Sequence, residues 1–126
     1  MPDFKKYFIL PAPPEEVYAA LTFEPTIELW TGAPAQFQTV PDTEFSLWDD
    51  SIIGKNLAFD PGKMIKQEWY FGQQDQPSIV TIKLHPDKKG TSMEVVHSNI
   101  PPEAYEEIVD GWVNVYFRDL QDFYNE

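Results

Sequence analysis

The end of the chain, residues 101–126, constrains the fold more than any other stretch. Pro101 and Pro102 suit the first turn of a helix, where a backbone N–H has no partner within the helix. A helix of about 24 residues would be roughly 36 Å long. The segment therefore predicts one long amphipathic helix that needs a broad apolar surface beneath it. Apolar side chains recur along it every three or four residues, at Tyr105, Val109, Trp112, Tyr116, Leu120 and Phe123.

The first part of the chain predicts a strand followed by two short helices. Residues 4–10 (FKKYFIL) read as a strand, which the prolines after it end. Residues 14–21 begin with Pro-Glu-Glu and carry an apolar stripe, which is typical of a helix start. Glu24-Pro25 separates this helix from a second one at 26–30, and Gly32 closes the second.

Period-two alternation dominates the middle of the chain and predicts six further strands. Turn signals join them, such as DPGK at 60–63 and DKKG at 87–90, together with the loop QQDQP at 73–77. Short turns between consecutive strands indicate an antiparallel sheet, one face of which the C-terminal helix must cover. The expected fold class is α+β: a curved antiparallel sheet of about seven strands, two short helices after the first strand and a long C-terminal helix across the sheet. The six strands are expected at 36–40, 44–48, 53–59, 64–71, 79–85 and 91–99.

Composition narrows the classes of partner. The net charge of −12 would repel the phosphate backbone of a nucleic acid and an anionic membrane surface. The chain has no cysteine, and no apolar run is long enough for a signal peptide or a membrane span. We therefore expect a single cytoplasmic domain over residues 1–126, as a monomer or weak dimer, with no nucleic-acid partner and no membrane span.

A curved sheet that grips a long helix tends to leave a cavity between them, and such interfaces are common ligand sites. Aromatic residues on the inward faces would line it, and two polar residues would join them. The same aromatic residues would equally serve as plain core packing. The candidate cavity residues are Trp30, Phe37, Phe45, Gln67, Trp69, His97, Tyr105, Trp112 and Tyr116.

His97 is the polar residue of greatest interest. Strand parity puts it on one face with Met93 and Val95, toward the helix. There it could hold a polar group of a ligand or take part in acid–base chemistry, or it could be a core histidine with satisfied hydrogen bonds. Gln67 shares the face of Ile65 and Trp69 and, if buried, needs a partner.

The sequence gives little support for a metal site, a phosphate-binding loop or a catalytic site. Asp42, Glu44, Asp49 and Asp50 lack the spacing of a calcium loop, and aspartate is common in hairpin turns. The chain has no glycine-rich phosphate loop and no nucleophile motif to accompany its two histidines. We therefore expect no metal site, no cofactor and no catalytic residues.

The ordered set of elements resembles the helix-grip fold of the START-like, Bet v-like SRPBCC superfamily. In detail it is more similar to the family of the heat-shock-protein-90 ATPase activators, C-terminal domain type. The most telling pair is Gly111-Trp112, inside a helix that follows a strand and Pro101-Pro102. The residues that carry the resemblance are 14–18, 21–22, 30–31, 54–65, 69, 81, 84, 90–93, 100–101, 111–112 and 116–117.

This resemblance implies three alternative functions. The first is a non-enzymatic domain that binds a small hydrophobic or lipid-like ligand between sheet and helix. The second is a chaperone-associated interaction module that uses its surface, with the acidic outer face of the helix as a docking face. The third is an enzyme of the polyketide cyclase/aromatase kind, for which the interior offers few polar groups. The eukaryotic activators carry an additional N-terminal domain, whereas this chain starts at the strand of the C-terminal-type domain and in that respect resembles bacterial members.

Overall fold

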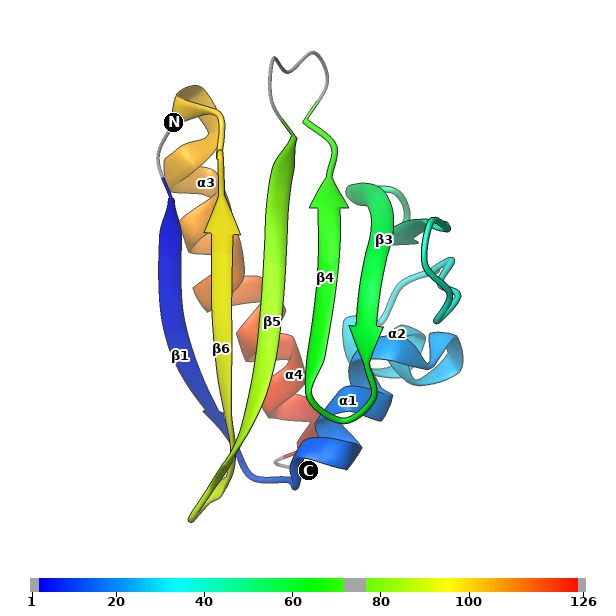
Figure 1. Ribbon diagram of the computed structural model, residues 1–126, viewed down its shortest axis with the longest axis vertical. Coiled ribbons are helices and arrows are strands. Elements are labelled where there is room, and N and C mark those ends of the chain that lie inside the picture. The colour runs from blue at the N-terminus through cyan, green and yellow to red at the C-terminus, as the bar shows by residue number, and fades with distance from the viewer. Residues whose placement is uncertain (1–2, 72–76, 125–126) are drawn as a thin grey trace.

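The computed structural model describes residues 3–71 and 77–124 and has the expected α+β helix-grip architecture. Strands form one antiparallel sheet, and helices cover a single face of it (Figure 1). The loop expected at 73–77 lies, up to residue 76, outside the described residues. The elements before the last helix are β1 (Phe4–Leu10), α1 (Pro14–Thr22), α2 (Glu24–Thr31), β2 (Glu44–Leu47), β3 (Ile52–Asp60), β4 (Met64–Trp69), β5 (Ser78–Asp87) and β6 (Gly90–Ser98).

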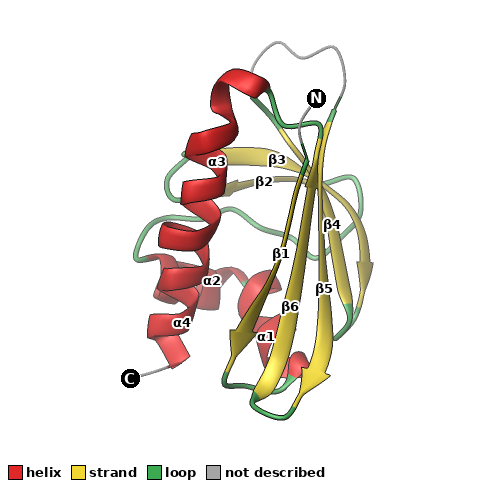
Figure 2. Ribbon diagram, turned by 90° about the vertical axis from the view of Figure 1, so that its left-hand side faces the viewer, coloured by secondary structure: helices red, strands yellow, loops and turns green. Residues whose placement is uncertain are grey.

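The sheet has the order β1-β6-β5-β4-β3-β2 within the described residues, and every neighbouring pair is antiparallel. In β6 the buried residues alternate strictly with half-buried ones, so Met93, Val95 and His97 share the inner face as predicted. A register shift in β3 between Asn56 and Ala58 is a β-bulge, which increases the local twist. Figure 2 shows the result: β2 and β3 cross behind the long helix, whereas β1, β5 and β6 run alongside it.

The C-terminal helix crosses the inner face as four consecutive segments. They are the 3₁₀ turn η1 (Pro102–Ala104), α3 (Tyr105–Gly111), the π-helical segment η2 (Trp112–Tyr116) and α4 (Phe117–Tyr124). In the π-helical segment the Phe117 N–H donates to the Trp112 carbonyl, five residues back. Such π segments are rare in proteins, and those that occur often lie at functional sites. This one coincides with the two most buried aromatic residues of the helix, Trp112 and Tyr116.

The prediction of a strand at 36–40 is wrong. The sheet of the described residues has six strands instead of about seven. Only Gln36 pairs with the sheet, through an isolated bridge to Ser46. Acidic side chains of α2 take the neighbouring backbone donors. The Ala35 N–H donates to Glu28 at 3.0 Å and the Phe37 N–H donates to Glu24 at 2.8 Å. These bonds satisfy the backbone locally, so the segment does not need a strand partner.

Strand β2 also ends one residue earlier than expected, at Leu47. Trp48, Asp49 and Asp50 follow with φ of 50°, 52° and 68°, in the left-handed region. Three consecutive non-glycine residues in this region are uncommon, and the conformation is costly for residues that carry a Cβ. Ser46 helps to hold the turn, because its hydroxyl accepts the Asp50 N–H at 3.1 Å.

None of the described helices is long and apolar enough to cross a membrane.

Candidate functional site

Two stacked tryptophans occupy the centre of the interface between sheet and helix. Trp69 ends β4, and Trp112 begins the π-helical segment. Their ring centroids are 5.0 Å apart and the ring planes differ by 18°. Each indole N–H is held by a buried polar side chain: Trp69 donates to Oε1 of Gln67 at 3.0 Å, and Trp112 donates to Nδ1 of His97 at 3.1 Å. These bonds fix the orientation of both rings.

His97 is fully buried, and both of its ring nitrogens are engaged. Because an indole N–H can only donate, Nδ1 must be the acceptor, which leaves the proton of the neutral ring on Nε2. Nε2 then donates to the Ser78 hydroxyl at 2.7 Å, and that hydroxyl donates to the Ser98 carbonyl at 3.3 Å. Burial lowers the pKa of His97 to about 4, against a smaller opposing effect of Asp3. His97 is therefore a neutral anchor for Trp112 and has no lone pair free for a substrate.

Gln67 is also buried and satisfied by side chains. Its amide nitrogen donates to Oδ1 of Asn56 at 3.1 Å. Asn56 in turn donates to the Gln38 carbonyl at 3.0 Å, outside the sheet. The chain of bonds from Trp69 through Gln67 and Asn56 thus ties the aromatic centre to the loop before β2. A continuous, satisfied polar network of this kind makes the interior rigid.

Tyr116 extends the aromatic layer toward α2. Its ring centroid lies 4.5 Å from that of Trp112, 5.2 Å from that of Trp30 and 5.5 Å from that of Trp48. Burial raises the pKa of the Tyr116 hydroxyl strongly, so this group stays protonated. The Trp30 indole donates to the Ala20 carbonyl at 2.8 Å, and that of Trp48 donates to Asp119 at 3.3 Å. All four tryptophans thus have a partner for their N–H group.

A partly open cavity of about 370 Å³ lies beside this aromatic layer. The helix from Glu107 to Tyr116 forms one wall, and the ends of β3 and β4 form the other. Its volume is within the range of small-molecule sites. The lining residues are Trp48, Ser51, Ile52, Ile53, Trp69, Tyr70, Phe71, Glu107, Ile108, Gly111, Trp112, Val115 and Tyr116.

The family model described as "Activator of Hsp90 ATPase homolog 1-like protein" matches residues 11–124. The chain belongs to this family. The activator of 90 kDa heat shock protein ATPase homolog 1 of Mus musculus is 28% identical over 110 residues, which are 86% of this chain and 32% of that protein. The chain thus spans about a third of the length of the curated relatives it matches.

Solved structures agree on the fold of this AHSA1-like chain. A crystal structure of a protein from Mesorhizobium loti superposes with a TM-score of 0.82 at 26% identity, covering 96% of this chain and 95% of that one. A crystal structure described as an HSP90 activator from Plasmodium falciparum gives a TM-score of 0.86 at 22% identity and covers 96% and 94% of the two chains. The resemblance inferred from the sequence is therefore confirmed for family and fold.

The nine candidate residues of this AHSA1-like domain do not all meet at the cavity. Trp69, Trp112 and Tyr116 line it. Three others lie behind these rings: Gln67 and His97 hold the indole N–H groups, and Trp30 packs on Tyr116. The remaining three lie elsewhere. Phe37 and Phe45 pack against one another, Phe37 also contacts Phe59, and Tyr105 donates to the Asp3 carbonyl at 3.4 Å.

The nine candidates include Trp69 on the sheet side and Trp112 and Tyr116 on the helix side, but leave out the other lining residues on both sides. The helix residues outside the nine candidates form a second stripe beside the core stripe. They are Glu107, Ile108, Gly111 and Val115. Their spacing of three and four is a signal that was available in the sequence. The lining residues on the sheet side were harder to predict from the sequence. Trp48 reaches the cavity through its left-handed turn, and Tyr70 follows the end of β4.

Within the described residues, no group of three or more histidines and acidic residues could hold a metal ion.

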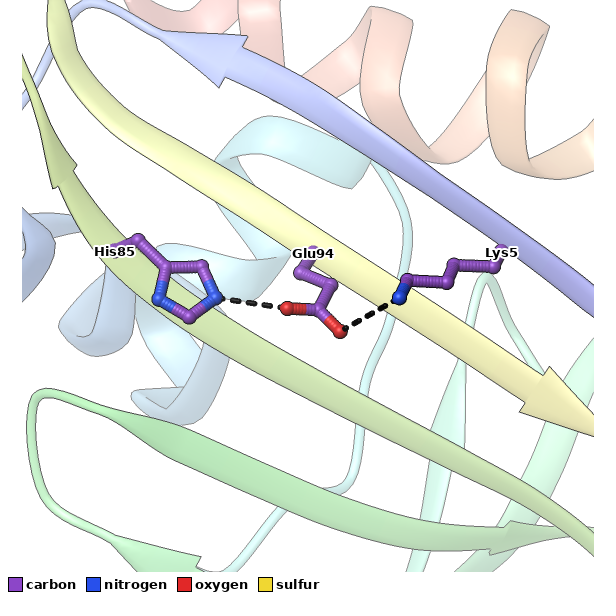
Figure 3. Close-up of polar contacts among 3 residues, drawn as sticks. All are labelled: Lys5, His85 and Glu94. Atoms are coloured by element: carbon purple, nitrogen blue, oxygen red, sulfur yellow. Dashed lines mark hydrogen bonds and ion pairs between the residues drawn. The ribbon is translucent and has the colours of Figure 1, made fainter.

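The second histidine lies on the opposite, solvent-facing side of the sheet (Figure 3). His85 on β5 contacts Glu94 on β6 at 2.8 Å, and Lys5 on β1 lies 3.8 Å from the other oxygen of Glu94. The hydrogen bond from His85 is the main cause that lowers the pKa of Glu94. His85 and Lys5 are well exposed, so solvent screens the cluster and its effect on stability is small.

Proposed function

We propose that this AHSA1-like domain binds a small, predominantly apolar ligand in the cavity beside Trp69, Trp112 and Tyr116. The observation that carries this proposal is a rigid aromatic wall next to open space. The indole N–H groups of Trp69 and Trp112 are satisfied by Gln67 and His97, so these two rings need no ligand to complete their hydrogen bonds. A preorganised apolar cavity with few polar groups is the usual form of a ligand site.

Gly111 supports the same proposal. It lines the cavity, and a Cβ added there would meet nothing within 4 Å. Glycine inside a helix costs about 1 kcal/mol relative to alanine, so its place at the cavity wall has a stability cost. A glycine inside a helix can permit either close approach to the sheet or room for a ligand, and the empty space at Gly111 favours the second.

The test is to fill the cavity from this position. We expect Gly111→Leu to raise the dissociation constant for a neutral bicyclic aromatic, 1-naphthylmethanol, by at least about tenfold, because the new side chain would occupy the ligand's space. Isothermal titration calorimetry measures the constant. Gly111→Ala is the matched control, since it changes the backbone preference equally but adds one methyl group. Equal binding by the wild type and Gly111→Leu would contradict the proposal.

The curated relatives favour a second candidate, a module that acts on a 90 kDa heat shock protein. Glu106 and Asp110 are exposed on the outer side of α3 and would contact a basic partner surface. We expect the purified chain to raise the ATPase rate of such a chaperone, and the double variant Glu106→Lys, Asp110→Lys to lose this effect. An unchanged ATPase rate with the wild-type chain, together with no complex in sedimentation, would rule this candidate out.

A further inference from the structure

The cavity carries charge of one sign. Glu107, exposed at its edge, is the one charged residue among the described residues that line it. All nine lysines and arginines of the chain belong to the described part, and none of them lines the cavity. An anionic ligand would therefore lose its water without meeting a cationic partner, which is costly.

Aromatic residues make up half of the other lining residues. Six of the thirteen lining residues are aromatic: Trp48, Trp69, Tyr70, Phe71, Trp112 and Tyr116. The faces of such rings carry partial negative charge and attract cations, most strongly in the case of tryptophan. The same property disfavours an anion above the ring.

Further carboxylates lie next to residues that line the cavity. Asp119 accepts the Trp48 indole N–H at 3.3 Å, on the helix side. On the sheet side, the pKa of the Tyr70 hydroxyl is raised by burial and then by the negative charges of Glu44 and Glu68. Negative groups thus lie near both walls, although the ligand would contact only Glu107 directly.

From these observations we propose that the cavity selects flat aromatic ligands that carry a positive charge, such as arylalkylammonium compounds, over carboxylates of the same shape. This inference rests on the proposed function, because it names the chemical class of ligand for the same cavity. The aromatic rings would hold the flat part, and Glu107 would pair with the cationic group at the edge.

Three probes that share one ring system test the inference. They are the cation (1-naphthylmethyl)trimethylammonium, the neutral alcohol 1-naphthylmethanol and the carboxylate naphthalene-1-acetate. We expect the ammonium compound to bind at least about tenfold more tightly than the carboxylate, with the alcohol between them. Calorimetry gives the affinities. Indole N–H resonances give the location, since those of Trp69 and Trp112 should shift, whereas that of Trp30, which does not line the cavity, should not.

Two isosteric variants separate the local effect from the general acidity of the chain. Glu107→Gln removes the carboxylate at the cavity, whereas Glu106→Gln removes its exposed neighbour, which does not line this cavity. Both change the net charge equally. We expect the advantage of the ammonium compound over the alcohol to fall by about threefold or more in Glu107→Gln and to stay unchanged in Glu106→Gln.

The outcomes distinguish the two proposals. If no probe binds, ligand binding itself fails, and the inference fails with it. If the alcohol binds but the carboxylate binds as tightly as the ammonium compound, only the inference is overturned. Equal effects of Glu106→Gln and Glu107→Gln would also overturn it, because the preference would then reflect the overall charge of the chain.

Discussion

At the scale of single residues, His97 shows how a buried histidine can serve structure instead of catalysis. Its Nδ1 accepts from Trp112 and its Nε2 donates to Ser78, so protonation of Nδ1 would break the bond to the indole. The charged form is thus opposed both by burial and by the loss of that bond. The fold therefore holds this residue neutral and uses it to position an aromatic ring.

This arrangement predicts that stability falls as the pH is lowered from 6.5 to 4. The pKa of His97 is about 4 in the folded chain and about 6.5 when unfolded, so the unfolded state binds the proton first. The contribution, about 3 kcal/mol, is complete above pH 6.5 and is lost as the pH falls toward 4. Urea unfolding at several pH values measures the loss. An NMR titration of the His97 ring tests the assignment, and a midpoint of 6.5 or higher would contradict it.

At the scale of elements, two glycines have opposite roles. Gly54 in β3 faces β4 and β2 so closely that an added Cβ would overlap the Glu68 carbonyl oxygen and lie 2.9 Å from Cε2 of Phe45. Gly111 at the end of α3 has open space where its Cβ would be. The first glycine permits strands to approach, whereas the second leaves room beside a helix.

These roles predict opposite effects of one substitution. Gly54→Ala should destabilise the chain by about 1–3 kcal/mol, because neighbouring backbone must shift to make room. Gly111→Ala should be neutral or stabilise it by up to about 1 kcal/mol, since alanine is the better helix former. Denaturant titrations of the two variants measure both values. The same sign of change in both variants would show that one of the two environments is misassigned.

The elements also show where sequence patterns suffice. The stripe from Val109 to Leu120 and the alternation of Met93, Val95 and His97 correctly placed the helix and the last strand, because burial on one face imposes their periods. The segment at 36–40 alternates as well, yet the carboxylate of Glu24 binds its backbone at Phe37, and that of Glu28 binds the preceding residue, Ala35. That competition depends on tertiary contacts, so the pattern alone could not reveal it.

At the scale of the whole molecule, the site depends on how three parts of the chain meet. The Trp48 turn, the end of β4 and the π-helical segment are distant in sequence and together enclose the cavity. The sequence pointed to Trp69, Trp112 and Tyr116 because they lie on core stripes. It could not place Trp48 beside them, since the left-handed turn that carries this residue follows no period.

The anchored tryptophans would also affect the rate at which a ligand leaves the proposed site. Because Gln67 and His97 already hold the rings of Trp69 and Trp112, the wall does not need to reorganise when a ligand arrives. Association would then be governed by encounter at the mouth and would differ little between related compounds. Differences in affinity would appear almost entirely as residence time, so the compound that fits the aromatic wall best is the one that stays longest.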